Sequence, residues 1–190
     1  MEIILASQSP RRKEILSLLG VPFKILVSEA DESFDDCMPP YFIAESISLK
    51  KAAAVAKNVT EDALVIGADT IVVSDGKILG KPTDEEDAFC MLSRLSGKWH
   101  EVISGVTVLH TKSAESKSFY VKTKVRFADL SDKEIRDYIA TKEPADKAGA
   151  YGIQGIGAKF IEEIEGDYFN VVGLPLSKLY QVLKKDFGLF

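Results

Sequence analysis

The sequence has few of the residues that form stabilising disulfides or structural metal sites. Its 190 residues include only two cysteines, Cys37 and Cys90, and two histidines. Two thiols without neighbouring His or Cys form neither a disulfide framework nor a thiolate zinc site. We therefore expect free thiols, as in a reducing compartment.

Long apolar runs are also absent. No stretch approaches the ~20 apolar residues that a membrane-spanning helix needs. The first apolar run, at residues 3–6, is followed by polar residues and by the basic residues 11–13, which is not the layout of a signal peptide. We expect a cytoplasmic protein that does not associate with a membrane.

An excess of positive charge is missing as well. The 24 Lys and Arg against 29 Asp and Glu leave a net charge of −5. Nucleic-acid and membrane-surface binders draw affinity from a large positive field, so we expect no stable nucleic-acid complex. A composition of 46% hydrophobic and 28% charged residues is typical of a folded domain. One domain over residues 1–190 is the expectation for this length.

Short apolar runs alternate with helical patterns along the chain, which predicts an α/β protein. Strands are expected at residues 3–6, 23–28, 63–68, 71–73, 77–79, 100–110 and 118–130. Helices are expected after the N-cap Ser9 and from the Pro39-Pro40 pair to about Lys57. Further helices are expected after capping boxes at Thr83/Glu86 and Ser131/Glu134, and from Pro175 to about Lys185. Residues 158–164 and 168–172 flank a turn.

The first candidate site lies where the first strand gives way to a helix. Ser7, Ser9, Arg11 and Arg12 gather hydroxyl and guanidinium groups at a helix N-terminus. Such an end carries unpaired N–H groups and a positive dipole, which suit phosphate oxygens. A well-capped helix with surface arginines is the alternative.

The second candidate is Asp69, which is followed by Thr70 and comes directly after the apolar residues 63–68. A carboxylate at the end of a buried strand needs a partner, and strand ends are where open α/β sheets bind ligands. Asp69 is therefore expected to be a metal ligand or a general base. A turn aspartate bonded to backbone is the alternative.

Two lysines and an acidic segment complete this set. Lys51 falls on the long helix and Lys81 lies before Pro82, where solvated lysines are the ordinary case. The acidic residues are Glu29, Asp31, Glu32, Asp35 and Asp36. Carboxylates near phosphate-binding groups provide the oxygen ligands that Mg²⁺ or Mn²⁺ requires. A solvated acidic loop is the alternative.

The last candidate is a glycine-rich segment at residues 146–157. Its glycines permit close backbone approach and exposed N–H groups, Tyr151 offers a ring, and Gln154 offers an amide that can read a base edge. The segment is neither a Walker A loop nor a dinucleotide fingerprint. A flexible turn, and a place in the core for Tyr151, are the alternatives. Together the candidates indicate a metal-dependent enzyme acting on a nucleoside triphosphate.

The sequence resembles the Maf family of nucleotide pyrophosphatases over essentially its whole length. The motifs that carry the resemblance are LASQSPRR at 5–12, GADT at 67–70, GKP at 80–82, LSG at 95–97, DKAGAYGIQG at 146–155 and VGLP at 172–175. The resemblance implies an inosine-triphosphatase-like α/β fold, in which a long mixed sheet and its helices form two lobes around a central cleft. It also suggests a homodimer, although the residues themselves leave the oligomeric state open.

The resemblance implies hydrolysis of a nucleoside triphosphate to the monophosphate and pyrophosphate with a divalent cation, Mg²⁺ or Mn²⁺. Asp69 is then the proton acceptor and, with Glu32, the metal contact. The phosphate and substrate contacts are Ser7, Ser9, Arg11, Lys51 and Lys81. The residues that select dTTP and UTP are Arg12, Thr70 and Gln154. An amide can pair with O4 and N3–H of a pyrimidine.

Two alternatives stay open at this point. The chain could bind dTTP or UTP as a regulator of septum formation and cell division with negligible turnover. As an enzyme, it could act on modified pyrimidine triphosphates in a house-cleaning role, because a small substituent changes binding by only ~1–3 kcal/mol.

Overall fold

The computed structural model describes residues 1–35 and 37–190, so Asp36 of the acidic segment lies outside the described residues. The strands are β1 (Glu2–Leu5), β2 (Lys24–Ile25), β3 (Ala63–Ser74), β4 (Lys77–Leu79), β5 (Trp99–His110), β6 (Ser116–Phe127) and β7 (Ile161–Glu165). The α-helices are α1 (Pro10–Ser17), α2 (Pro40–Ala56), α3 (Glu85–Leu95), α4 (Asp132–Ala140), α5 (Tyr168–Val172) and α6 (Leu176–Lys185). Short 3₁₀ helices occupy Glu143–Asp146, Ala148–Ala150 and Ile156–Phe160.

The strands form one seven-stranded sheet in the order β2-β1-β3-β5-β6-β7, with β4 paired to β3. Strand β1 runs parallel to β2 and to β3, whereas the β3–β4 and β6–β7 pairs are antiparallel. The predicted α/β class with a long mixed sheet is confirmed.

The chain divides into two compact units. The first consists of Met1–Asp69, Ser104–Val121 and Gly173–Phe190, and the second of Thr70–Ile103 and Lys122–Val172. One boundary falls inside β3, between Asp69 and Thr70.

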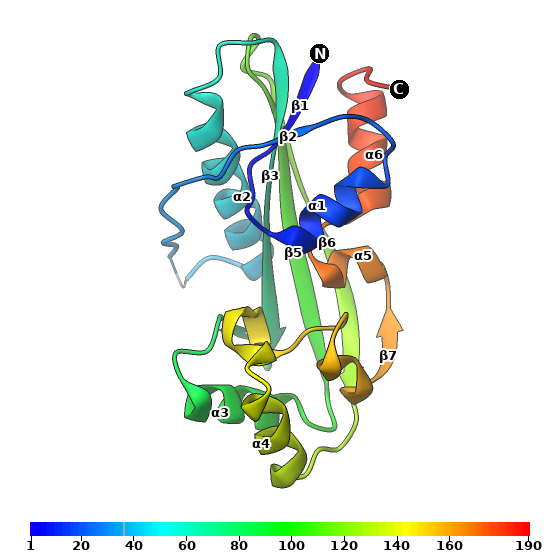
Figure 1. Ribbon diagram of the computed structural model, residues 1–190. Helices are drawn as coiled ribbons and strands as arrows, with labels where there is room; N and C mark the ends of the chain where they lie inside the picture. The colour runs from blue at the N-terminus through cyan, green and yellow to red at the C-terminus, as the bar shows by residue number, and fades with distance from the viewer. Residues whose placement is uncertain (36) are drawn as a thin grey trace. The chain divides into compact units, whose positions relative to one another are not determined.

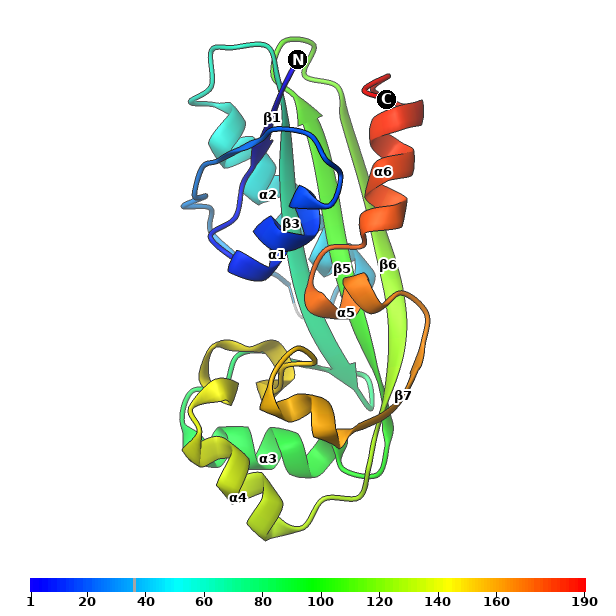
Figure 2. The same ribbon diagram turned by 45° about the vertical axis from the view of Figure 1, so that its right-hand side comes forward.

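In the first unit, helix α2 lies on the opposite side of β1 and β3 from α1 and α6 (Figures 1 and 2). Two glycines allow α2 to approach the sheet closely. A Cβ on Gly67 would lie 2.2 Å from the Ser48 carbonyl oxygen, and a Cβ on Gly105 would lie 2.2 Å from the Ala44 carbonyl. These positions therefore exclude any larger residue while the helix keeps its place.

In the second unit, α3 packs on α4, as Figure 2 shows, over a core that contains the buried rings of Phe127, Tyr138 and Phe160. The β3–β4 hairpin turns at Asp75 and Gly76, both with positive φ, as predicted from this residue pair.

Several predicted elements are confirmed. Ser9 caps α1 with Pro10 in the first turn, Ser131 and Glu134 form a capping box on α4, and α6 ends at Lys185. Helix α2 ends one residue before the expected Lys57. The thiols of Cys37 and Cys90 are free and exposed.

Other predictions are wrong. Helix α3 is capped by Asp84, whose side chain accepts a hydrogen bond from the Asp87 N–H at 2.8 Å, and not by a Thr83/Glu86 box. The strand expected at residues 23–28 is reduced to Lys24–Ile25, and the 3₁₀ helix Ile156–Phe160 takes up the start of the expected 158–164 run.

Asp69 lies within β3 and not after its end, because the predicted strands 63–68 and 71–73 are one continuous strand of 12 residues. Thr70, a good strand former, continues the pleat through this position. The carboxylate is therefore fixed by the sheet rather than by a turn.

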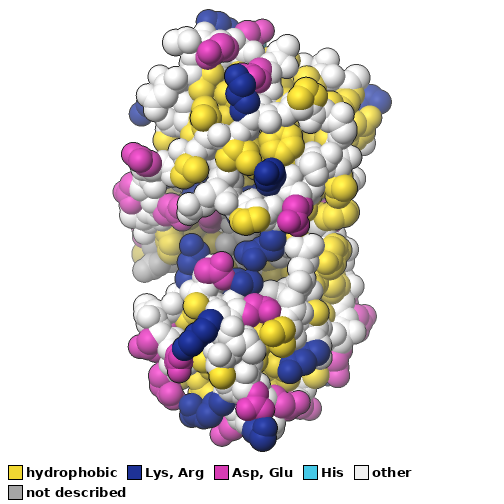
Figure 3. Space-filling view, viewed as in Figure 1, with side chains coloured by type: hydrophobic (Ala, Val, Ile, Leu, Met, Phe, Trp, Pro, Cys, Tyr) yellow, Lys and Arg dark blue, Asp and Glu magenta, His cyan; other side chains and the backbone are white. Residues whose placement is uncertain are grey.

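The surface mixes charges of both signs. On the face drawn in Figure 3, acidic side chains are interspersed with basic ones over each unit. Across the part of the chain that the structure describes, none of the helices combines the length and the apolar character that a membrane span requires.

Candidate functional site

Three charged side chains meet in the first unit. The Nζ atom of Lys51, on α2, lies 2.7 Å from Oδ1 of Asp69, on β3, and 3.1 Å from Oε1 of Glu32. The side chains of Lys51 and Asp69 are only 11% and 12% exposed, whereas that of Glu32 is 60% exposed. The cluster is thus a nearly buried ion pair with a third, solvated carboxylate at its edge.

The close approach of α2 to β3 explains why this pair forms. Residues two apart share one face of a strand, and residues three apart share one face of a helix. Gly67 contacts the helix at Ser48, so Asp69 comes next on the same face of β3 and Lys51 comes one turn later on α2. The glycine of the GADT motif therefore allows the carboxylate to lie against the lysine.

The hydroxyl and guanidinium groups at the start of α1 form a second cluster in this unit. Ser7 Oγ accepts hydrogen bonds from the Ser9 N–H at 3.2 Å and from Nη1 of Arg12 at 3.4 Å. Nε of Arg12 donates to the Gly173 carbonyl at 2.9 Å, and Ser9 Oγ caps the Arg12 N–H. Arg12 is thus held at both ends of its guanidinium group.

Electrostatics connects these two clusters. Burial lowers the pKa of the Arg12 guanidinium, and the Asp69 carboxylate opposes this change most strongly. Arg11 adds to the lowering and Glu32 opposes it. Because Asp69 and Glu32 act on Arg12 through space, a change in the charge of either carboxylate will change the pKa of this arginine.

The donor set of the first unit suits a hard divalent cation. Asp69 and Glu32 direct carboxylate oxygens at the same ammonium nitrogen, and carboxylate oxygens are the ligands that Mg²⁺ and Mn²⁺ prefer. Within residues 1–35 and 37–190, no group of three or more His, Cys, Asp or Glu side chains could hold a metal. Protein ligands from this set would therefore number two, which is usual for Mg²⁺ at phosphate sites.

Two other residues of the acidic segment, Asp31 and Asp35, have local partners. Oδ1 of Asp31 accepts from the Ser33 N–H at 2.9 Å, and Oδ1 of Asp35 accepts from the Cys37 N–H at 2.9 Å. These bonds stabilise turns within the acidic segment. Of the acidic-segment residues that the structure describes, Glu32 is the one that is ion-paired with Lys51.

Three predicted site residues, Thr70, Lys81 and Gln154, belong to the second unit. Thr70 lies on β3, while Lys81 and Gln154 are exposed on loops. The Gly149 N–H donates to the Gly80 carbonyl at 3.0 Å, which joins the GKP turn to the glycine-rich segment.

The composition of the glycine-rich segment predicts N–H groups that are exposed to a ligand. In the structure, two of these groups already have a partner. The N–H groups of Ile156 and Gly157 donate to the carboxylate of Glu143, at 2.7 and 3.1 Å. Glu143 was not among the predicted residues, because nothing in its spacing marks it as a partner of a loop 13 residues later. It is a structural anion held by the segment itself.

Tyr151 belongs to the core and does not offer a free stacking face. Its side chain is buried, and its hydroxyl lies 2.7 Å from Nε2 of the buried His100. Its ring packs edge-on against Phe127 and His100. Of the two side chains singled out in the glycine-rich segment, Tyr151 is buried and Gln154 is exposed.

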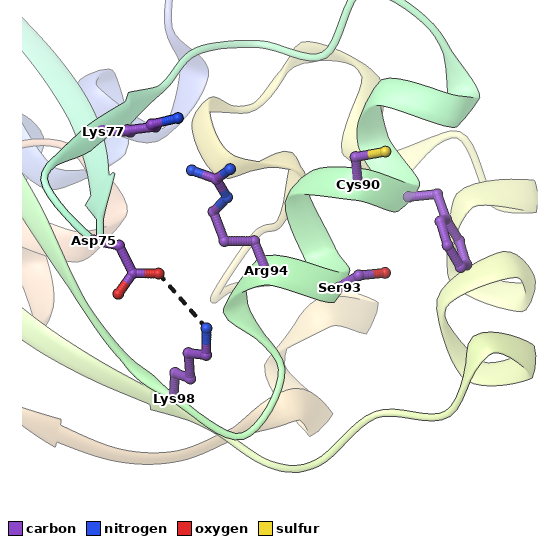
Figure 4. A pocket seen from close by; sticks show the side chains of 7 residues that line it. Asp75, Lys77, Cys90, Ser93, Arg94 and Lys98 are labelled. Atoms are coloured by element: carbon purple, nitrogen blue, oxygen red, sulfur yellow. Dashed lines mark ion pairs between the residues drawn. The ribbon is translucent and has the colours of Figure 1, made fainter.

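A separate pocket of about 580 Å³ lies beside α3 and the β3–β4 hairpin (Figure 4). It is lined by Asp75, Lys77, Phe89, Cys90, Ser93, Arg94 and Lys98. Nζ of Lys98 lies 3.6 Å from Oδ2 of Asp75. This pocket contains none of the site residues predicted from the sequence.

Comparison with known proteins gives a consistent family. The model of the family described as Maf-like protein matches residues 2–186. The dTTP/UTP pyrophosphatase of Thermoanaerobacter sp. (strain X514) is 51% identical over 189 residues, which cover 100% of this chain and 98% of that protein. The dTTP/UTP pyrophosphatase of Bacillus cereus (strain AH820) is 52% identical over 184 residues, 97% and 95% of the two chains.

Among solved structures, the Staphylococcus aureus Ham1 protein is similar with a TM-score of 0.48 and 15% identity. The match covers 85% of this chain and 80% of that chain.

Proposed function

Since the chain belongs to the Maf-like protein family, we propose that it is a nucleoside triphosphate pyrophosphatase that hydrolyses dTTP and UTP to the monophosphate and pyrophosphate. Two relatives that are 51% and 52% identical over nearly the whole chain carry the name dTTP/UTP pyrophosphatase. The observation that carries the proposal is the Lys51–Asp69–Glu32 cluster, which places a nearly buried carboxylate beside a cation.

Asp69 is the proposed general base. Lys51 donates to Oδ1 of Asp69, and the carboxylate keeps further lone pairs with which it can orient a water molecule and accept its proton. Because Asp69 lies within β3 and its side chain is 12% exposed, its position is fixed before substrate binds. A positioned general base typically contributes about 10²–10⁴-fold to a rate.

The proposed phosphate contacts are hydroxyl, guanidinium and ammonium donors. Ser7, Ser9, Arg11 and Lys51 supply hydroxyl, guanidinium and ammonium donors in the first unit, and Lys81 supplies an ammonium in the second. The bonds of Arg12 to Ser7 and Gly173 support a preorganised arrangement at the start of α1. Donors that are fixed in place stabilise charge on the leaving pyrophosphate without reorganising.

Asp69 and Glu32 are the residues that would hold the divalent cation. When bound, Mg²⁺ or Mn²⁺ supplies electrostatic stabilisation to the phosphate oxygens at the bond that breaks.

Selectivity for pyrimidines is proposed to depend on Arg12, Thr70 and Gln154. The exposed amide of Gln154 can accept from N3–H and donate to O4 of uracil or thymine. Modified pyrimidine triphosphates would present the same edge. A cytoplasmic location, where these nucleotides are used, is part of the same proposal. A homodimer is also part of it.

The test is pyrophosphate release from dTTP, UTP, CTP, GTP and 5-methyl-UTP with Mg²⁺, Mn²⁺ or EDTA. We expect release from dTTP and UTP that requires the cation. Tight binding of these nucleotides without release would contradict the enzyme and favour a regulatory binding protein. Release from GTP at the rate of UTP would contradict the selectivity.

A further inference from the structure

The glycine-rich segment is assembled around one carboxylate of the second unit. Glu143, the first residue of a 3₁₀ helix, accepts from the Ile156 N–H at 2.7 Å through Oε2. Its Oε1 accepts from the Gly157 N–H at 3.1 Å and from the hydroxyl of Tyr138 at 2.8 Å. Three donors thus converge on one side chain.

The charge of Glu143 suits this position. Partial burial raises the pKa of its carboxyl, but the bonds from Ile156, Gly157 and Tyr138 and the charge of Lys147 outweigh burial, so the pKa is below its usual value. Hydrogen bonds to a charged acceptor are about twice as strong as neutral ones. The Glu143 carboxylate therefore stabilises the folded backbone of the glycine-rich segment.

Two glycines of the glycine-rich segment are required by this carboxylate and its partner. A Cβ on Gly155 would lie 2.5 Å from both Glu143 oxygens, and a Cβ on Gly157 would lie 2.6 Å from the Tyr138 hydroxyl oxygen. The glycines therefore allow the backbone to wrap the Glu143 side chain.

Gln154 lies between anchored residues. On one side, the Gly152 N–H donates to the Tyr138 hydroxyl at 3.2 Å and the Tyr151 hydroxyl bonds His100. On the other side, Ile156 is bonded to Glu143. Gln154 itself is exposed. An exposed amide is thus presented by a short backbone segment that is fixed at both ends.

We propose that Glu143, acting with Tyr138, is the positioning residue for Gln154 and thereby sets the selectivity of the enzyme for uracil and thymine over cytosine. The inference rests on the proposed function, in which Gln154 reads the base. A glutamine amide pairs with uracil in one orientation and with cytosine when it is turned over. Discrimination therefore requires surroundings that favour one orientation of the amide, and an anchored loop keeps those surroundings in a fixed place; a preordered loop also reduces the entropy lost on binding.

The test compares Glu143→Gln and Tyr138→Phe with the control Glu162→Gln. Glu162 is an exposed strand residue of the same unit, paired with Arg126 at 3.0 Å, so it undergoes the same chemical change away from the loop. Glu143→Gln puts an NH₂ group against a donor. Tyr138→Phe removes one donor to Glu143 and the acceptor of the Gly152 N–H, but it keeps the carboxylate with both of its backbone bonds and is the milder change. Three quantities are measured: kcat/KM for UTP and CTP, equilibrium binding of both nucleotides in EDTA, and hydrogen exchange of the backbone amides of residues 151–160.

In Glu143→Gln, we expect the UTP-to-CTP ratio of kcat/KM, and of affinity, to fall roughly tenfold. Exchange at Ile156 and Gly157 should accelerate. Tyr138→Phe should give a smaller change of the same kind, and Glu162→Gln should give none. In a Gln154→Ala background, Glu143→Gln should leave the UTP-to-CTP ratio unchanged, because both substitutions act on the same interaction with the base.

An unchanged UTP-to-CTP ratio with accelerated exchange would overturn the positioning role, and so would equal losses for both nucleotides. Unchanged exchange would overturn the anchoring of the loop by Glu143. If the unmodified protein releases no pyrophosphate, the proposed function fails by itself, and the binding ratio and the exchange data still decide the role of Glu143.

Discussion

Replacing Lys51 by methionine tests the ion pair at the centre of the site. Methionine keeps most of the apolar stem but leaves the carboxylate of Asp69, 12% exposed as a side chain, without its ammonium partner. Breaking a buried pair in this way costs about 3–5 kcal/mol. Because Arg12 also acts on Asp69, we take the lower figure, about 3 kcal/mol.

The assay is unfolding in urea. With a slope of roughly 2 kcal/mol/M, a loss of about 3 kcal/mol lowers the midpoint by about 1.5 M. Lys50→Met is the matched control, since Lys50 is the preceding residue on α2 and donates to the Ser33 carbonyl at 2.6 Å rather than to a buried carboxylate. Its midpoint should fall by less than about 0.5 M. Equal shifts in the two variants would refute the argument from burial.

Two further predictions concern the fold. Gly67→Ala should lose about 1–3 kcal/mol or more of unfolding free energy, since its Cβ would meet the backbone of α2, while Gly80→Ala, with open space, should lose less than about 1 kcal/mol in the same urea assay. Burial lowers the pKa of His100 to about 4 from 6.5, so the unfolded chain binds a proton that the folded chain does not. Stability should therefore fall between pH 6.5 and 4, by up to roughly 3 kcal/mol, and His100→Gln should flatten this decline; an equal slope in the variant would contradict the assignment.

The sequence predicted the elements whose signals are local. Ser9 and Ser131 marked the starts of α1 and α4, and the Asp75-Gly76 pair marked the hairpin. Asp84 was missed as the cap of α3 because Thr83 beside it is also a good capping residue. The sequence predicts Asp69 after the end of a strand because aspartate is rare in strands.

What could not be predicted depends on contacts between distant parts of the chain. The bond of Arg12 to the Gly173 carbonyl joins residues 161 apart, and the wrapping of Glu143 by the glycine-rich segment has no periodic pattern. The composition of that segment indicated N–H groups available for a ligand, but it could not show that a carboxylate of the same chain accepts two of them. Lys51 was singled out from the sequence, whereas its pairing with Asp69 follows from how closely α2 approaches β3.

The most direct test of the proposed mechanism is pyrophosphate release from UTP by Asp69→Asn, with UTP binding measured on the same preparation. The account predicts that turnover falls by about 10²–10⁴-fold while UTP affinity stays within a few-fold of the unmodified protein. Turnover close to that of the unmodified protein would remove Asp69 from the role of general base and contradict the account.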